Sequence, residues 1–197
     1  MAYALANDLR LFLRHPGPFT DNEIAQAELL IELAEGAIDD ETGQSLELAT
    51  DTVILDGPTR SERWPDAPGT GSRTLILPRW PVTAVESVIL LRDSEDDETL
   101  TFGQDYTWSA AGTLTRVNSW WPSGDRCIQV VDTAGHSPIP KGVKRIALRV
   151  AAAGWGNPEL LASESLGDHS KSWSAEALGM VLSEADKKTL GLYRART

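Results

Sequence analysis

A proline-bounded strand pattern near the middle of the chain most constrains its fold. Pro78 and Pro81 fix their own φ angles and push the residues before them toward extended backbone. Residues 82–91 follow as a run rich in β-branched side chains, which is typical of a strand. Strand and turn signals continue after this run, whereas helical periodicity occupies both ends of the chain. The order predicts an α+β fold, with a helical bundle of N- and C-terminal helices and an inserted antiparallel β module.

Helical periodicity defines the predicted bundle, which comprises residues 1–45 and 138–197. Two helix starts are marked by capping boxes, Thr20–Glu23 and Ser183–Asp186, in which a hydroxyl and a carboxylate three residues apart satisfy free amides. The predicted helices cover 5–13, 21–41, 139–153 and 183–194, with a structured loop over 159–175. The apolar stripe of the second helix is Ile24, Ala27, Ile31, Ala34 and Ile38.

Two of these helices also carry charged stripes. Like charges at spacings of three and four destabilise an isolated helix by a few tenths of a kcal/mol per pair, so we expect other groups to use them. The acidic stripe is Glu28, Glu32, Glu35 and Asp39. The basic flank is Lys141, Lys144, Arg145 and Arg149.

The β module is predicted over residues 46–137. Its strand candidates are separated by turns at intervals that suit an antiparallel sheet or small barrel. They are 46–55, 74–77, 82–91, 100–102, 106–108, 113–117 and 127–132. Residues 57–72 are rich in proline and glycine, which predicts an irregular exposed loop. Cys127 falls in a strand pattern, which predicts a buried, inert thiol.

Charge is unevenly distributed along the 197 residues. The net charge is −11, and the segment from His15 to Thr59 holds 11 Asp and Glu residues but no Lys or Arg. Residues 141–197, by contrast, hold 9 Lys and Arg against 6 Asp and Glu. An acidic surface repels phosphates, which argues against tight nucleic-acid binding. No apolar run is long enough for a membrane span, and the first residues lack the basic region of a secretory signal, so we expect synthesis in the cytoplasm.

No catalytic, metal or cofactor site is predicted. His15, His136 and His169 are far apart, without the paired spacing of metal ligands. The run Gly167–Ser170 holds Asp, His and Ser side by side, whereas a triad needs groups that converge from separate positions. The acidic turn over 93–98 lacks the spacing of a calcium loop.

A succession of short motifs resembles the head–tail connector, or adaptor, proteins of tailed bacteriophages. The first is Leu-Pro-Arg-x-Pro-Val-x-x-Val-x-x-Val, which begins at Leu77 and is followed by an acidic turn. In order and spacing the motifs cover most of the chain. The others are Gly103–Tyr106, Gly112–Arg116, Trp121–Gly124, Val130–Gly135, the 138–153 helix, Glu164–Ser172, Leu182–Asp186 and Leu190–Arg194.

The resemblance implies a structural virion protein and no enzymatic activity. Such adaptors form a ring, commonly a dodecamer, beneath the portal, where they extend the DNA channel and join the capsid to the tail. The implied partners are the portal protein, a neck or tail-completion protein and further copies of the chain. DNA passes through without specific binding, and no membrane is involved. C-terminal residues of the family help to dock on the portal. The corresponding candidates here are Lys187, Lys188, Leu190, Tyr193, Arg194 and Arg196. Because a short helix is marginal alone, we expect this segment to serve docking and not folding.

Two roles are predicted for the charged stripes. The acidic residues Glu28, Glu32, Glu35 and Asp39 could pair with Lys141, Arg145 and Arg149, either within one subunit or between ring neighbours. Alternatively, Glu28, Glu32 and Glu35 could line the channel, where carboxylates repel passing DNA.

Two other functions remain open on the sequence. One is a carbohydrate- or peptide-binding β module with helical arms, which would use Trp108, Trp120 and Trp121 as a stacking surface. Aromatic residues at a strand end more often serve as core or interface anchors. The other, ranked last, is a hydrolase that uses His136 or His169.

Overall fold

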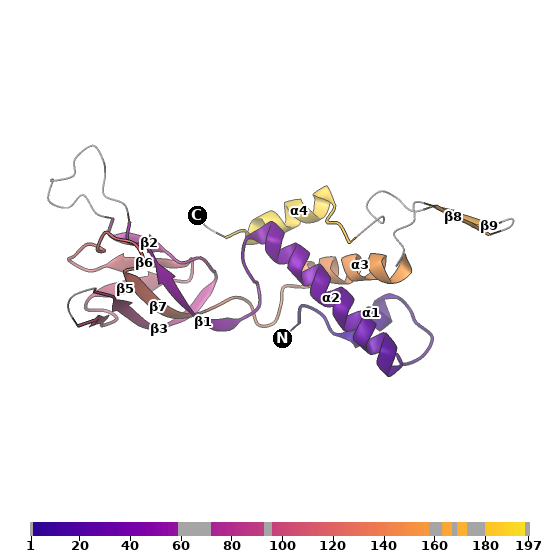
Figure 1. The fold of residues 1–197 in the computed structure, drawn as a ribbon, viewed down its shortest axis with the longest axis horizontal. Helices are drawn as coiled ribbons and strands as arrows, with labels where there is room; N and C mark the ends of the chain where they lie inside the picture. Colours follow the sequence, from indigo (N-terminus) through magenta and orange to yellow (C-terminus); the bar gives the residue numbers. More distant parts are fainter. Residues whose placement is uncertain are drawn as a thin grey trace. The chain divides into compact units, whose positions relative to one another are not determined.

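The structure is a computed structural model, which describes residues 2–58, 72–92, 96–157, 163–166, 169–172 and 180–195. The chain divides into two compact units. One comprises Met1–Glu47 and Pro138–Arg194, and the other is built mainly from Leu48–Ser137. Figure 1 shows helices α1 to α4 in the first unit and labels strands β1, β2, β3, β5, β6 and β7 in the second. Separate helices and antiparallel sheets confirm the predicted α+β class.

The helical unit contains both the predicted helices and one unpredicted hairpin. Its described elements are α1 (Ala6–Phe12), α2 (Asp21–Thr42), α3 (Lys141–Gly156), β8 (Ser163–Leu166), β9 (His169–Ser172), α4 (Glu184–Leu190) and the 3₁₀ helix η2 (Gly191–Tyr193). The segment 159–175 was predicted as a structured loop, and its described part forms the hairpin β8–β9, whose two strands pair antiparallel.

Local capping explains where α2 begins and ends. Thr20 accepts the Glu23 amide at 3.4 Å, and the Thr20 amide donates back to the Glu23 carboxylate at 2.7 Å. At the other end Gly43 has φ 68°, a left-handed conformation that glycine adopts without steric cost, and its amide donates to the Asp39 carbonyl.

The core of the helical unit lies between α1, α2, α3 and α4. Ala27, Ile31, Ala34 and Ile38 of α2 are buried as predicted, together with Leu9, Val143, Ile146, Val150 and Leu190. Ile24 is instead 37% exposed, because the first turn of α2 lies outside this cluster.

Gly154 lets α3 pack closely and does not end it. The helix was predicted to stop at residue 153 but continues to Gly156. A Cβ added at Gly154 would lie 2.8 Å from Cδ2 of Leu30 and 3.1 Å from Sδ of Met180. The glycine is therefore a packing position inside a helix, which a reading of glycine as a helix terminator misses.

The β unit consists of two antiparallel sheets. Strands β1 (Ala49–Leu55), β7 (Ile128–Ala134), β3 (Val82–Leu90) and β4 (Glu98–Leu100) form one sheet in that order. Strands β2 (Thr74–Ile76), β6 (Thr113–Arg116) and β5 (Tyr106–Ser109) form the other. Val130 in the middle of β7 pairs with Val53 on one side and Val88 on the other.

Alternate residues of β7 are buried, as a half-covered strand requires. The core of the β unit includes Leu77, Val88, Tyr106, Leu114, Trp121, Ile128 and Val130. Cys127 packs against this core but is only half-buried, so the prediction of a buried thiol holds in part. Most of the predicted 57–72 loop lies outside the described residues.

Candidate functional site

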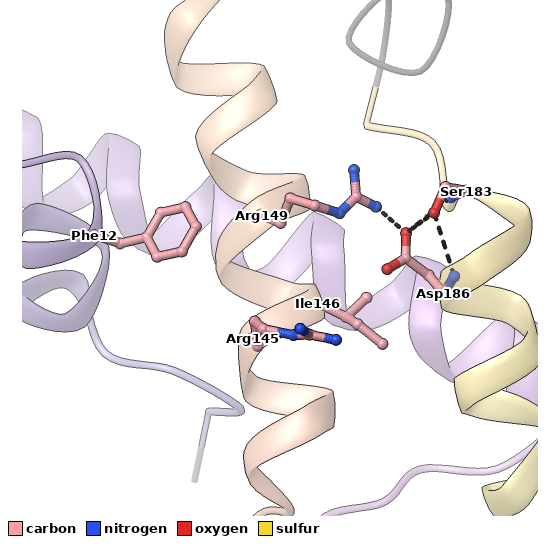
Figure 2. Close-up of a pocket in the computed structure, with 6 residues that line it drawn as sticks. All are labelled: Phe12, Arg145, Ile146, Arg149, Ser183 and Asp186. Carbon is pink, nitrogen blue, oxygen red and sulfur yellow. Dashed lines mark hydrogen bonds and ion pairs between the residues drawn. The ribbon is translucent and has the colours of Figure 1, made fainter.

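An ion pair between α3 and α4 organises the basic side of the helical unit. Arg149 donates to the carboxylate of Asp186 (Figure 2). The same carboxylate accepts from the Ser183 hydroxyl and, at 3.0 Å, from the Ser183 backbone amide. Asp186 is only 8% exposed, so the guanidinium neutralises a nearly buried charge. The contact holds α4 against α3, and it is intramolecular.

A hollow of about 400 Å³ lies beside this pair. It is lined by Phe12, Arg145, Ile146, Arg149, Ser183 and Asp186. Figure 2 shows a dashed line from Arg149 to Asp186, whereas Arg145, one turn earlier on α3, has no drawn partner. Lys141 and Arg145 are exposed, and neither has an ion pair among the described residues. Lys144 between them pairs with Asp8 of α1 at 2.7 Å.

A second hollow, of about 350 Å³, is acidic. Its carboxylates are Glu28, Glu32, Glu35 and Glu47, and its apolar lining includes Leu5 and Ile31. Glu28 and Glu32 are exposed and form no ion pair with any residue that the structure describes. The two hollows therefore place unpaired charges of opposite sign on different parts of one unit.

Tyr3 contacts the last two residues of the acidic stripe, Glu35 and Asp39. Its amide donates to Glu35, and its hydroxyl donates to Asp39 while accepting the Leu46 amide at 2.7 Å. Burial and the neighbouring Asp39 raise the pKa of Tyr3, so the phenol stays neutral and donates. Burial, opposed in part by the Tyr3 amide, also raises the pKa of Glu35.

These contacts separate the seven residues that the sequence proposed for charge pairing. Arg149 pairs with Asp186, and Glu35 and Asp39 contact Tyr3. Within one subunit, these three residues therefore contact groups other than the opposite stripe that the sequence predicted. Glu28, Glu32, Lys141 and Arg145 remain without partners in the described chain. The half-buried Glu35 is a poor candidate for channel lining, because its carboxylate accepts a hydrogen bond from the Tyr3 amide.

We expect Glu35→Gln to stabilise the helical unit at neutral pH by less than about 1 kcal/mol, since the site is half open to solvent. The folded state binds the Glu35 proton more tightly than the unfolded state, so the wild type loses stability as pH rises from the usual value of 4.5 through the raised pKa. Gln stays neutral and can still accept the Tyr3 amide. Urea unfolding at several pH values tests this, with the exposed Glu28→Gln as control. An advantage that grows below pH 4.5 would contradict it.

The terminal helix belongs to the core, which corrects its assignment to docking alone. Leu190 is fully buried, the Gln44 side-chain amide donates to the Tyr193 carbonyl at 2.6 Å, and Arg194 pairs with Glu41 of α2. Packing against α2 and α3 supplies the stability that a seven-residue helix lacks alone. Leu190 is thus unavailable to a portal, and Tyr193 is half-buried. Lys187, Lys188 and Arg194 are the docking candidates that stay at the surface, and Arg196 lies outside the described residues.

The three tryptophans proposed for ligand binding, Trp108, Trp120 and Trp121, do not form one stacking surface. Trp121 is 3% exposed, and the guanidinium of Arg116 lies 5.6 Å from its ring centroid. Trp108 packs partly buried against the same core. Only Trp120 of the three is exposed, at 41%, and Arg73 covers its ring at 4.8 Å. The arrangement is that of core anchors, and the proposed sugar platform loses two of its three members.

The described residues offer no assembled reactive centre built on histidine. His15 lies 3.7 Å from Glu23, and burial lowers the pKa of His136 in the β unit. In the described part of the chain, no group of three or more His, Cys, Asp or Glu side chains could hold a metal ion. No described helix combines the length and apolar character needed to cross a membrane.

Chains in solved gene transfer agent (GTA) particles resemble this structure over nearly its whole length. A chain in the neck of an empty GTA particle, computed with C6 symmetry, aligns with 99% of this chain and 91% of its own, at TM-score 0.62 and 18% identity. This chain has the fold of that neck component. Two further chains agree: one in the virion of the native particle (TM-score 0.60, 15% identity, 99% and 91% covered) and one in the native neck computed with C12 symmetry (0.55, 16%, 98% and 91%). No protein-family model and no curated protein matches the sequence.

The neck fold agrees with the resemblance to head–tail connectors that the motifs indicated. Three contributors to the site were not predicted: Tyr3, Phe12 and the pairing role of Asp186. The capping box revealed Asp186 as a cap but carried no signal that Arg149 would reach it. Tyr3 precedes the first helix, where no periodicity points to a tertiary partner.

Proposed function

We propose that the chain is a structural neck protein of a phage-like particle that assembles as a ring. The observation that carries this proposal is the match of 98–99% of the chain to GTA neck and virion chains. Two of those necks were computed with C6 and C12 symmetry, which supports an arrangement of repeated copies around an axis.

In this proposal the ring is a head-to-tail adaptor. It lies beneath the portal, extends the DNA channel and offers a platform to a neck or tail-completion protein. The net charge of −11 supports passage of DNA without specific binding, because a surface rich in carboxylates releases no counterions from phosphate. The portal is expected to contact the terminal segment, where Lys187, Lys188 and Arg194 lie at the surface of the folded unit.

Removal of the gene from its particle-producing host tests the function. We expect heads that package DNA but carry no tails, with tail attachment restored when the protein is supplied in trans. Electron microscopy of restored particles should show a ring of this fold at the neck. Normal tailed particles made without the protein would refute the proposal.

Ligand binding by the β unit has less support than the neck role. A binding module that used Trp108, Trp120 and Trp121 would need exposed rings on one face, and Trp121 lies in the core.

A further inference from the structure

We propose that neighbouring copies in the ring meet through two different edges of the helical unit. The first, the α2 edge, consists of Glu28, Leu29, Glu32 and Leu33. The second, the α3 edge, consists of Lys141 and Arg145 with Phe12 of α1 beside them. This inference rests on the proposed ring and names the surfaces that close it.

Charge is the first argument. Each edge carries two exposed charges of one sign, and none of the four is paired among the described residues, although most neighbouring charges are. Both pairs are four residues apart on a helix, so the Cβ atoms within each pair lie about 5–6 Å apart. The two carboxylates can therefore face the two basic groups at once.

Exposed apolar side chains are the second argument. Leu29 and Leu33 of α2 are 54% and 52% exposed and lie next to the acidic pair. They point away from the buried stripe of α2, because each residue turns by about 100° around a helix. On the other edge, Phe12 is 46% exposed and lines the same 400 Å³ hollow as Arg145 (Figure 2). Large apolar side chains next to unpaired charges are typical of protein interfaces, and here both edges have them.

The occupant of each edge is a second copy because the edges complement each other and not themselves. Two α2 edges would repel, as would two α3 edges. Contact between unlike edges is heterologous, so it repeats head to tail and closes into a ring when the rotation allows. The assignment also decides between the two roles predicted for Glu28 and Glu32: they are buried between neighbours and do not line the channel.

Complementary charge reversals test the contact in particles. Variant A carries Glu28→Lys and Glu32→Lys, and variant B carries Lys141→Glu and Arg145→Glu. All four positions are exposed and unpaired among the described residues, so both variants should fold, which thermal melts verify. Alone, each variant presents like charges at every contact, and we expect a loss of tailed particles on the order of tenfold or more.

Co-expression of A and B is the decisive arm. The reversed α2 edge of A fits the reversed α3 edge of B, and the two unaltered edges fit each other. Alternating rings with an even number of copies should therefore restore tailed particles. As a control, Glu86→Lys with Asp125→Lys makes the same charge change as variant A at exposed carboxylates of the β unit and should leave assembly intact.

The outcomes separate the contact from the proposed function. If A or B alone supports wild-type numbers of tailed particles, or if both fail and their mixture fails too, the contact is refuted while the neck role stands. If deletion of the gene leaves tails attached, the neck role itself is refuted, and the contact with it.

Discussion

Truncation after Leu182 is expected to unfold the helical unit at temperatures where the full chain is folded. The deletion removes Leu190, whose side chain is fully buried among α2 and α3. It also removes Asp186, the partner of Arg149, and the Tyr193 carbonyl that accepts from Gln44. The Arg149 guanidinium and the Gln44 amide would each lose one of these hydrogen bonds, which adds to the cost of the lost packing.

Single substitutions within the same segment make this prediction quantitative. Leu190→Ala is expected to lower the free energy of unfolding by about 2–5 kcal/mol, a large share of the roughly 5–15 kcal/mol that holds a domain folded. Leu192→Ala is the matched control, because Leu192 is 73% exposed and its truncation should change stability by less than about 0.5 kcal/mol. Circular dichroism during urea unfolding measures both. If the truncated chain melts like the full one, α4 makes no contribution to the core.

Local signals predicted the starts of α2 and α4 well, because neighbouring residues decide where these two helices begin. The Thr20–Glu23 and Ser183–Asp186 boxes both form as expected, and α2 buries four of the five residues of its predicted stripe. The strand pattern after Pro81 likewise becomes β3. Capping and periodicity act over a few residues, so they can be read without knowing the fold.

Contacts between residues far apart in the sequence could not be predicted in the same way. Stripes of opposite charge on α2 and α3 match in length, yet Arg149 pairs with Asp186, which is 37 residues away. The carboxylates Glu35 and Asp39 are taken by Tyr3, near the N-terminus. The terminal helix has too few residues to be stable alone, so its place in the core depends on packing that sequence periodicity does not encode. The four residues without an ion pair in the described chain belong to the charged stripes that the sequence indicated, and their pairing between copies stays a prediction.

Gly57→Ala is expected to destabilise the β unit by about 3 kcal/mol, near the upper end of overpacking effects. A Cβ at this position would lie 1.9 Å from the carbonyl oxygen of Pro122 and 2.9 Å from its carbonyl carbon. Both are backbone atoms, so no side-chain rotation can relieve the clash. The segment cannot retreat freely either, because the Gly57 amide donates to the Gly124 carbonyl at 2.7 Å and the adjacent Trp121 is anchored in the core.

Gly36→Ala is the same glycine-to-alanine change, but it is expected to stabilise the protein. A Cβ there meets nothing within 4 Å, and Gly36 lies in the interior of α2, where alanine should add about 0.5–1 kcal/mol of stability. Five of the seven tryptophans lie in the β unit, so tryptophan fluorescence during denaturant unfolding reports mainly on that unit, and helical circular dichroism reports on the helical unit. A Gly57→Ala chain that unfolds at the wild-type midpoint would show that the Pro122 segment can yield. Equal destabilisation by both alanines would mean that added bulk, and not the backbone contact at Gly57, causes the effect.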